Sequence, residues 1–348
     1  MTARSARGHG VAATVLTVVT GIALARGADS EPTAGSSAPT MKAVRIHEFG
    51  KPGVLVYEDA PRPQAGPGEV LVSIHAAGVN PVDWKIRSGM FRGMNAPMPM
   101  ILGFDISGVV ESVGADVQQF RQGDEVFAYM SLRRGGGYAE FVAVPEGELA
   151  IKPKSIDHVH AAGVPLAGLT AWQALFDTAG LKEGQTVLIH GGAGGVGHFA
   201  VQMARARGAK VIATASAPNH EFLKSIGADQ CIDYRTQKFE EHVKDVDVVL
   251  DTIGGDTQAR SFQVLKPGGY LVSIVQPPDP ELLAQHEIKG RVILVQPNGK
   301  QLAEIAALVD QGKVKPHVSE TVPLRDAAHA HIQSQGGHTR GKIVLKVR

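Results

Sequence analysis

The chain has 348 residues, with 35 lysines and arginines against 34 aspartates and glutamates, which gives a net charge of +1. This balance excludes the broad basic field that attracts nucleic acid or an acidic membrane surface, so we expect a small molecule as the partner. Cys231 is the single cysteine, which excludes an internal disulfide and a zinc site built from several thiolates. The length predicts about two domains.

Residues 1–40 are expected to lie outside the fold. Arg4 and Arg7 precede an uncharged run, residues 11–25, which ends in Ala-Leu-Ala and passes into a polar stretch. This order is typical of a secretory signal followed by a flexible linker, and the run is shorter than the roughly 20 residues of a membrane span. An uncleaved anchor and a true start at Met41 stay open as alternatives. A genuine signal predicts export, and a start at Met41 predicts a cytoplasmic protein.

Short strands separated by turns are predicted from Met41 onward. They are expected at residues 41–46, 69–79, 106–113, 125–128 and 138–144. Strands this short, at such regular spacing, indicate a compact β barrel or sandwich. A helical pattern at 159–179 then leads into a different module.

The second module repeats a strand and helix unit. Strands are expected at 186–190, 210–215, 230–233, 246–251, 269–275 and 291–295, with helices that include 221–226, 239–244 and 257–265. Apolar strands that alternate with helices predict an α/β fold with a doubly wound parallel sheet. A helix at 301–310, a strand at 318–322, a helix at 325–333 and a strand at 342–347 are expected to return to the first module.

A glycine cluster follows the first strand of the α/β module and opens a helix. Gly192, Gly194 and Gly197 have the G-x-G-x-x-G spacing, in which the glycines permit a tight turn, close approach of a pyrophosphate and close helix–sheet packing. Gly195 and Val196 lie within the same loop and are expected to contact the cofactor too. The N-terminus of the helix offers free N–H groups and a positive dipole. A glycine-rich loop without a ligand is the alternative, and a P-loop is excluded because no Lys-Ser or Lys-Thr closes the cluster.

With these motifs in view, the chain resembles the medium-chain dehydrogenase/reductase superfamily, in its zinc-free quinone oxidoreductase and enone reductase branch. The resemblance rests on MKAVRIHEFG, GPGEVLVSIHAAGVNPVDWKIRSG, GFDISGVVESVG, GDEVFA, GGYAEFVAV, AAGVPLAGLTAWQAL, the glycine cluster and HTRGKIVLKV, and it covers residues 41–348. It implies a GroES-like substrate domain at 41–165, completed by 299–348, and a Rossmann domain at 166–298. It also implies an active site in the cleft between them, and a homodimer in many members.

The resemblance also bears on zinc. The alcohol dehydrogenases of this superfamily bind catalytic zinc through a cysteine and a histidine, and those places are held here by Asn80 and by Gly103-Phe104-Asp105. An amide and a phenyl ring do not replace a thiolate and an imidazole on Zn²⁺. We therefore expect no zinc. Hydride addition to an electrophilic alkene or quinone needs no metal, whereas alcohol oxidation without a Lewis acid is disfavoured.

The end of the second α/β strand indicates which nicotinamide cofactor binds. An NAD site usually has Asp or Glu there, and this chain has Ala215-Ser216, so NADPH is favoured. Ser216 and His220 are the expected neighbours of the 2′-phosphate, and the resemblance adds Tyr234. The alternatives are an ordinary turn residue for Ser216 and a solvated helix start for His220.

For the nicotinamide end, the resemblance implies contacts from Asn80, Thr170, Ile253-Gly254, Ile274 and Lys342. Thr170 has the alternative of a core helix residue whose hydroxyl bonds back to its own turn. Lys342 has the alternative of an exposed strand lysine.

Lys85 is the candidate catalytic residue, because it stands where several family members carry a tyrosine. An ammonium can hydrogen-bond a carbonyl oxygen and stabilise the enolate that forms as hydride arrives. Pairing with a carboxylate such as Asp83, or a contact with the cofactor ribose alone, are the alternatives, and water can protonate an enolate.

The leading hypothesis is an NADPH-dependent reductase of quinones or α,β-unsaturated carbonyls, two substrate classes that one site serves. A catalytically idle NADPH-binding redox sensor is the alternative from another class. A zinc-type alcohol dehydrogenase is disfavoured by its missing ligands.

Overall fold

The computed structural model describes residues 39–92 and 97–348, so nearly all of the expected leader lies outside the described residues. The described chain is built on three β-sheets, and one large hydrophobic core is shared between its β-rich and α/β parts. Among these residues, no helix combines the length and hydropathy needed to cross a membrane.

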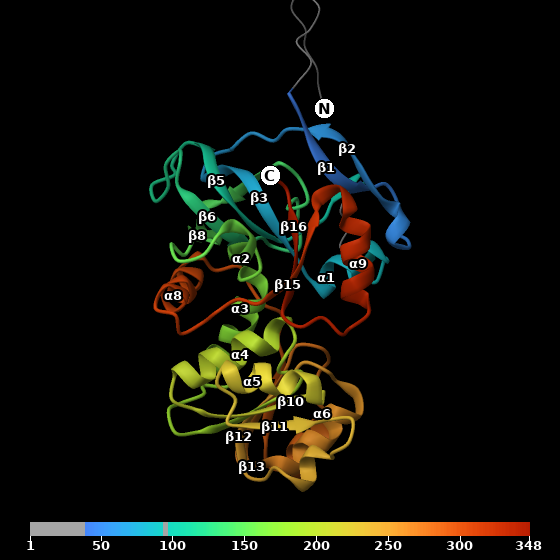
Figure 1. The fold of residues 1–348 in the computed structure, drawn as a ribbon, viewed down its shortest axis with the longest axis vertical. Coiled ribbons are helices and arrows are strands. Elements are labelled where there is room, and N and C mark those ends of the chain that lie inside the picture. The colour runs from blue at the N-terminus through green and yellow to red at the C-terminus, as the bar shows by residue number, and fades with distance from the viewer. Residues whose placement is uncertain (1–38, 93–96) are drawn as a thin grey trace, which may run out of the picture. The chain divides into compact units, whose positions relative to one another are not determined.

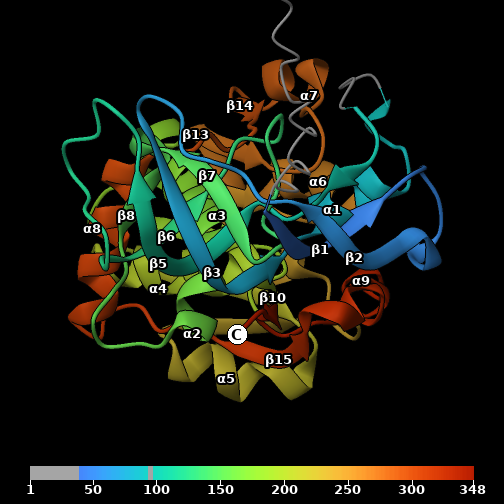
Figure 2. The same cartoon turned by 90° about the horizontal axis from the view of Figure 1, so that it is seen from above.

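The β-rich part holds two of the sheets. β1 (Thr40–Ile46) pairs with β2 (Leu55–Pro61) and β4 (Met100–Ile101). The larger sheet has the order β15-β16-β3-β5-β6-β8, with β7 paired to β3, and Figure 2 shows β3 beside β5 and β7. Its strands are β3 (Glu69–Val79), β5 (Asp105–Val113), β6 (Glu125–Tyr129), β7 (Phe141–Pro145), β8 (Leu149–Ile151), β15 (Val318–Pro323) and β16 (Lys342–Lys346). The C-terminal strands therefore complete a sheet begun by the first 150 residues.

Five helices of the described residues belong to the β-rich part. They are α1 (Pro81–Arg87), α2 (His158–Ala162), α3 (Pro165–Trp172), α8 (Gly299–Asp310) and α9 (Ala327–Gln335). The N-cap residue of α1 is Asn80, whose backbone N–H donates to Asp83 Oδ2 at 2.6 Å and whose backbone carbonyl accepts from Asp83 N at 3.0 Å. This cap fixes Asn80 at the end of β3, where the strand meets the helix.

The α/β part is a six-stranded parallel sheet with the order β11-β10-β9-β12-β13-β14. Its strands are β9 (Thr186–Ile189), β10 (Lys210–Ala215), β11 (Gln230–Asp233), β12 (Val246–Asp251), β13 (Leu265–Ser273) and β14 (Lys289–Val292), and its helices are α4 (Gly195–Ala206), α5 (His220–Ser225), α6 (Gly255–Ser261) and α7 (Pro280–Gln285). Figure 1 shows α4 and α5 over β10 and β11. This order is that of two mononucleotide-binding halves, which confirms the predicted doubly wound sheet.

The structure corrects three predicted elements. The helix predicted at 159–179 is broken between α2 and α3, because Pro165 lacks an N–H and restricts the residue before it, and it ends in a π-helical segment, Gln173–Thr178. The helix predicted at 239–244 is a 3-10 turn, Phe239–Glu241, followed by Asp245 at a left-handed φ of 54°. The last parallel strand is β14 rather than 291–295, because Val295 leaves the sheet and packs in the core.

The structure does not test the predicted domain boundaries. The shared core gives no sharp limit at residue 165 or 298. The division into 41–165, 166–298 and 299–348 stays a prediction.

Candidate active site

The glycine cluster forms the turn between β9 and α4. Gly191 has a φ of +64°, so the left-handed position lies one residue before the predicted Gly192. A Cβ on Gly192 would lie 2.8 Å from Ala213 Cβ, and a Cβ on Gly197 would lie 2.2 Å from Gly191 O. Gly192 and Gly197 are therefore required by packing within the protein.

Gly195 differs from these glycines, because the protein itself leaves it room. A Cβ there would meet only ordinary contacts, the nearest at 3.4 Å from Lys342 Cδ. Gly194 is the N-cap of α4, and the first bond that closes the helix runs from His198 N to Gly194 O, at 3.1 Å. The N–H groups of Gly195, Val196 and Gly197 precede that bond and have no helical partner. This open, positively polarised helix start fits the pyrophosphate of a dinucleotide.

A buried polar cluster joins β3, β5 and β16. Asn80 Nδ2 donates to Asp105 Oδ2 at 2.8 Å, and Lys342 Nζ donates to Asn80 Oδ1. Lys342 Nζ lies 3.7 Å from Asp105 Oδ2, and Asp105 Oδ1 accepts from Leu166 N at 2.7 Å. Burial raises the pKa of Asp105 to about 6, against the opposing charge of Lys342.

Lys342 connects this cluster to the glycine loop. Its side chain is 3% exposed, so the alternative of an exposed strand lysine is wrong. Gly341 N donates to Ala193 O at 2.9 Å, and Lys342 Cδ lies against Gly195. β16 thereby brings the Asn80–Lys342 pair beside the helix start of α4.

Lys85 lies half-buried on α1, with its Nζ 5.7 Å from the centre of the Trp84 ring. The alternative pairing with Asp83 is not present: Asp83 is fully buried and accepts from Asn80 N at 2.6 Å. Burial raises the pKa of Asp83 to about 7. Among residues 39–92 and 97–348, no carboxylate pairs with the ammonium of Lys85, so its donors can serve another partner.

A second set of polar groups lies around Tyr138, whose hydroxyl lies close to Asp83, and no sequence pattern indicates it. Tyr138 Oη and His331 Nε2 lie 3.2 Å apart, and Arg87 Nη2 donates to Gln335 Oε1 at 3.0 Å. Burial lowers the pKa of His331 to about 3, which keeps its ring neutral. The bond between Arg87 and Gln335 joins α1 to α9, and so helps to fix the helix that carries Lys85.

The ends of β12 and β13 hold the remaining nicotinamide-end candidates. Asp251, which the sequence analysis missed, is fully buried and accepts from Ile253 N at 3.0 Å and Gly254 N at 2.8 Å. Ile274 N donates to Asp251 O at 3.1 Å. Asp251 therefore shapes the loop after β12, and Ile253 is left 53% exposed.

Thr170 lies on α3 and is 4% exposed. Its hydroxyl donates to Leu166 O at 2.6 Å, as the core-helix alternative expected. A contact between Thr170 and the cofactor stays a prediction. Because the hydroxyl hydrogen is donated to Leu166 O, such a contact would use only the lone pairs of the Thr170 oxygen.

The candidates for the 2′-phosphate meet at the ends of β10 and β11. Ala215 pairs with Asp233 across these strands, which places Ser216 beside Tyr234. Asn219 Nδ2 donates to Ser216 Oγ at 3.1 Å, and His220 Nε2 lies 3.2 Å from Ala215 O. Tyr234 is 54% exposed.

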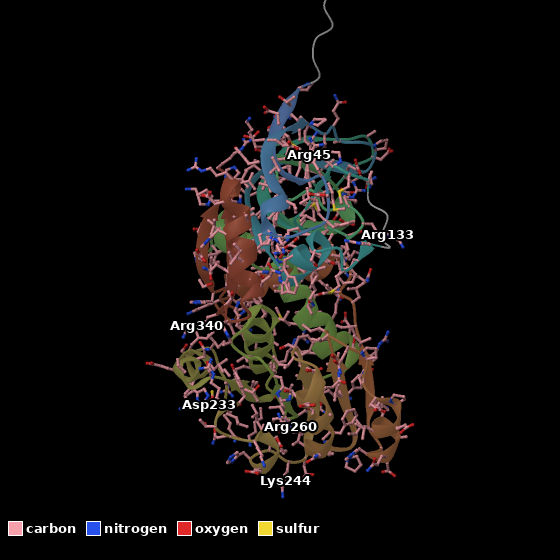
Figure 3. The ribbon with its side chains drawn as sticks, turned by 90° about the vertical axis from the view of Figure 1, so that its right-hand side faces the viewer. Arg45, Arg133, Asp233, Lys244, Arg260 and Arg340 are labelled. Carbon is pink, nitrogen blue, oxygen red and sulfur yellow. The ribbon has the colours of Figure 1, made fainter. Side chains whose placement is uncertain are left out.

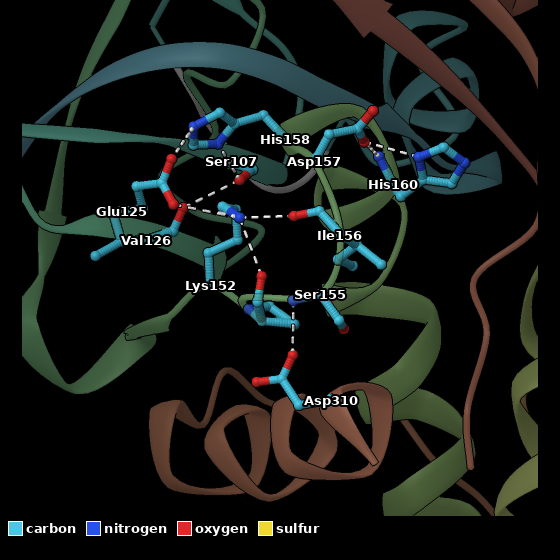
Figure 4. A network of polar contacts seen from close by, with 11 residues as sticks. Ser107, Glu125, Val126, Lys152, Ser155, Ile156, Asp157, His158, His160 and Asp310 are labelled. Carbon is cyan, nitrogen blue, oxygen red and sulfur yellow. Dashed lines mark hydrogen bonds and ion pairs between the residues drawn. The ribbon is translucent and has the colours of Figure 1, made fainter. Parts of the chain in front are cut away.

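Figure 4 shows a further network, which contains a serine, a histidine and a carboxylate as a hydrolase triad does. Its geometry indicates a structural role and not a catalytic one. Ser107 Oγ lies 2.8 Å from His158 Nδ1, and Glu125 lies 3.3 Å from both His158 Nε2 and Lys152 Nζ. Ser107 is fully buried, and its hydroxyl donates to Val126 O at 3.1 Å. The hydroxyl is therefore closed to a substrate, and the network fixes the chain that leads into α2.

Metal ligands were also expected to be missing. In the part of the chain that the structure describes, no three His, Cys, Asp or Glu side chains are grouped to hold a metal ion. The amide of Asn80 uses Nδ2 for Asp105 and Oδ1 for Lys342, so both of its polar atoms are engaged by the protein. The absence of zinc stays a prediction.

Two family models match the chain. Residues 66–154 match the alcohol dehydrogenase GroES-like domain, and residues 226–345 match the zinc-binding dehydrogenase model. The first match confirms the predicted GroES-like module.

Similar proteins cover most of the chain. The zebrafish protein named NAD(P)H oxidoreductase RTN4IP1, mitochondrial, is 35% identical over 88% of this chain and 91% of its own length. The Arabidopsis protein named NADPH-dependent alkenal/one oxidoreductase, chloroplastic, is 38% identical over 90% of this chain and 81% of its own length. The quinone oxidoreductase of Coxiella burnetii has a TM-score of 0.84 and 38% identity, and the match covers 89% of this chain and all of that one. The chain belongs to the quinone oxidoreductase and enone reductase branch of the medium-chain dehydrogenase/reductase superfamily.

Proposed function

We propose that the protein is an NADPH-dependent oxidoreductase that works without zinc and reduces quinones or the C=C bond of α,β-unsaturated carbonyls. The observation that carries this proposal is the position of the Asn80–Lys342 pair beside the open helix start of α4. A dinucleotide whose pyrophosphate lies at Gly195 would extend along Lys342 toward Asn80. The names of the plant alkenal/one and bacterial quinone oxidoreductases support the same substrate classes.

The cofactor, when bound, supplies the hydride, and the protein must then bind and orient both partners. The first N–H groups of α4 would bind the pyrophosphate, and Lys342 and Asn80 would bind the nicotinamide ribose. We assign the loop residues Ile253, Gly254 and Ile274, together with Thr170, to the nicotinamide end of the cofactor. Ser216, His220 and Tyr234 would surround the 2′-phosphate.

Zinc independence is supported by how the donor atoms are used. Asn80 stands where a zinc alcohol dehydrogenase has its thiolate, and its amide is bonded to Asp105 and Lys342. Freeing Asn80 for a metal would leave the buried Asp105 carboxylate without one of its donors, which is costly. An acceptor that is already electron-poor needs no Lewis acid.

Lys85 is the proposed polar contact for the substrate oxygen. It lies on α1, five residues after Asn80, and Asp83 is turned away from it. Its ammonium can donate to the carbonyl or quinone oxygen and stabilise the negative charge that develops there. Water then suffices as the proton source.

The test is NADPH oxidation, followed by absorbance, with a panel of quinones and enones and with NADH in parallel. We expect turnover with NADPH, and we expect Lys85→Ala to lower kcat by roughly 100- to 1000-fold with little change in cofactor affinity, as for loss of one oxyanion donor. Lys182→Ala, at an exposed site before β9, is the matched control. An unchanged rate in Lys85→Ala removes Lys85 from the mechanism.

The same experiment separates the alternatives. Binding of NADPH without its consumption by any acceptor indicates an idle redox sensor. A purified protein that holds one zinc ion per chain and oxidises alcohols overturns the proposal of a zinc-free enzyme. The homodimer implied by the family stays a prediction, which sedimentation of the purified protein tests.

A further inference from the structure

We infer that Arg340 is the residue that selects NADPH over NADH, by binding the 2′-phosphate. The inference rests on the proposed function and adds to it a residue that the sequence analysis did not assign. Arg340 Nε donates to Asn219 Oδ1 at 2.7 Å, and its Nη2 donates to Pro218 O at 3.1 Å. Arg340 and Asn219 are 121 residues apart in the chain, so only the fold brings them together.

Arg340 reaches the place where a Rossmann domain distinguishes the two cofactors. Pro218 and Asn219 lie three and four residues after the end of β10. An NAD site usually has a carboxylate at the end of this strand for the ribose 2′-hydroxyl. Here Ser216 stands at that end, and Asn219 Nδ2 donates to its Oγ at 3.1 Å. The hydrogen bonds therefore run from Arg340 through Asn219 to Ser216. Figure 3 labels Arg340 and Asp233, the last residue of β11, on the same side of the structure.

The charge of Arg340 is available for an anion. Its two hydrogen bonds go to an amide oxygen and a backbone carbonyl, which are both uncharged. Asp233, which pairs with Ala215 at the end of β10, uses its carboxylate within its own turn, where it accepts from Arg235 N at 3.1 Å and Thr236 Oγ1 at 3.2 Å. The guanidinium keeps further N–H groups in a fork that matches phosphate.

The guanidinium is also held in position. Its Cζ lies 5.4 Å from the centre of the Phe222 ring. Gly341 follows at a φ of +66°, and a Cβ there would lie 2.2 Å from His317 O, so the backbone at this point is closely fixed. After burial, the charge of Arg340 is the second cause that lowers the pKa of His317. Arg340 is therefore presented to the end of β10 before any ligand arrives.

The test measures the Kd of NADPH, NADH and 2′,5′-ADP for the full chain and for Arg340→Met. The last probe carries the phosphate without a nicotinamide. We expect Arg340→Met to weaken NADPH and 2′,5′-ADP by about 10- to 100-fold, as for a lost charged hydrogen bond, and to leave NADH within about twofold. Arg340→Lys, which keeps the charge and loses the fork, should lose less.

Two further variants sharpen the test. Asn219→Asp places a carboxylate beside Arg340 and should weaken NADPH selectively, without weakening NADH. Arg205→Met removes an arginine that pairs with Asp229 at 3.2 Å, before β11 begins, and should change neither affinity.

The outcomes separate the two proposals. A wild-type protein that binds NADPH, with an Arg340→Met variant that loses NADPH and NADH equally or loses neither, overturns the assignment of Arg340 alone. A wild-type protein that prefers NADH overturns it together with the proposed cofactor.

Discussion

Replacing Lys342 with methionine removes a buried positive charge and leaves the buried carboxylate of Asp105 without its ion-pair partner. At the 3.7 Å between Lys342 Nζ and Asp105 Oδ2, the attraction is about 4 kcal/mol at an effective dielectric constant near 20. Because a neutral carboxyl group does not need an ion-pair partner, this loss of free energy is limited in the variant by protonation of Asp105. Because its pKa is about 6, protonation limits the cost at pH 8 to about 2.7 kcal/mol, two pH units at about 1.36 kcal/mol each.

The sign of the pH dependence follows from the same carboxylate. The pKa of Asp105 is raised from its usual 3.8 to about 6 in the folded protein, so its contribution to stability is complete below pH 3.8 and is lost as the pH rises through about 6. Loss of Lys342 raises this pKa further, so the variant continues to lose stability above pH 6 while the wild type does not. The cost of Lys342→Met should therefore be near zero at about pH 5.5 and largest at about pH 8.

Urea unfolding followed by tryptophan fluorescence at these two pH values measures the difference. The double variant Lys342→Met/Asp105→Asn has no carboxylate to protonate, so its cost relative to the wild-type protein should vary less between the two pH values than that of Lys342→Met. A cost of Lys342→Met that is the same at both pH values would show that the two groups do not interact as an ion pair, and would refute the argument.

Two more predictions concern the glycine loop and the helix that follows it. Gly197→Ala should lower the Tm by about 2–12 °C, because its methyl group would lie 2.2 Å from Gly191 O. Gly195→Ala, whose methyl group would lie 3.4 Å from Lys342 Cδ, should keep the Tm and weaken NADPH binding instead. Equal losses of Tm in calorimetry would contradict this difference between the two glycines. His198 is buried with a pKa lowered to about 4, so its contribution is complete above pH 6.5 and is lost as the pH falls toward 4. His198→Asn should therefore flatten the acid loss of unfolding free energy in urea titrations between about pH 6.5 and 4.5, and an unchanged slope contradicts the assignment.

The sequence predicted the α/β sheet well, because each of its central strands is a short apolar run followed by a helix. Val187, Leu188 and Ile189 are all fully buried, as expected for a strand covered on both faces. The last strand of this sheet was harder to predict. The apolar run at 293–295 reads as strand, but Leu294 is 66% exposed, and β14 ends at Val292 because its register follows β13.

The site itself was predictable only where its residues are neighbours in the chain. The spacing of the glycines predicted the tight turn and the helix start after β9, although the left-handed glycine is Gly191. The contact of Asn80 with Lys342 spans 262 residues, and local periodicity carries no information on such pairs. Ser216, His220 and Tyr234 all lie on or next to the elements that follow the glycine loop, whereas Arg340 reaches Asn219 across 121 residues and only through the fold.

Three consecutive residues before and at the start of β16 join the parts of the candidate site. Arg340 bonds to the loop after β10, Gly341 N donates to Ala193 O at 2.9 Å in the glycine loop, and Lys342 bonds to Asn80. The first contact lies where we place the 2′-phosphate, the second at the pyrophosphate and the third at the nicotinamide ribose. From Ile343 onward β16 is paired with β3, so the segment that makes these three contacts leads directly into that pairing. A cofactor bound at all three points would therefore be aligned by one short segment, residues 340–342. Because Ile343 pairs with Val79, the same segment would also set the position of Asn80, and of Lys85 on the helix that follows, relative to the reactive end of the cofactor.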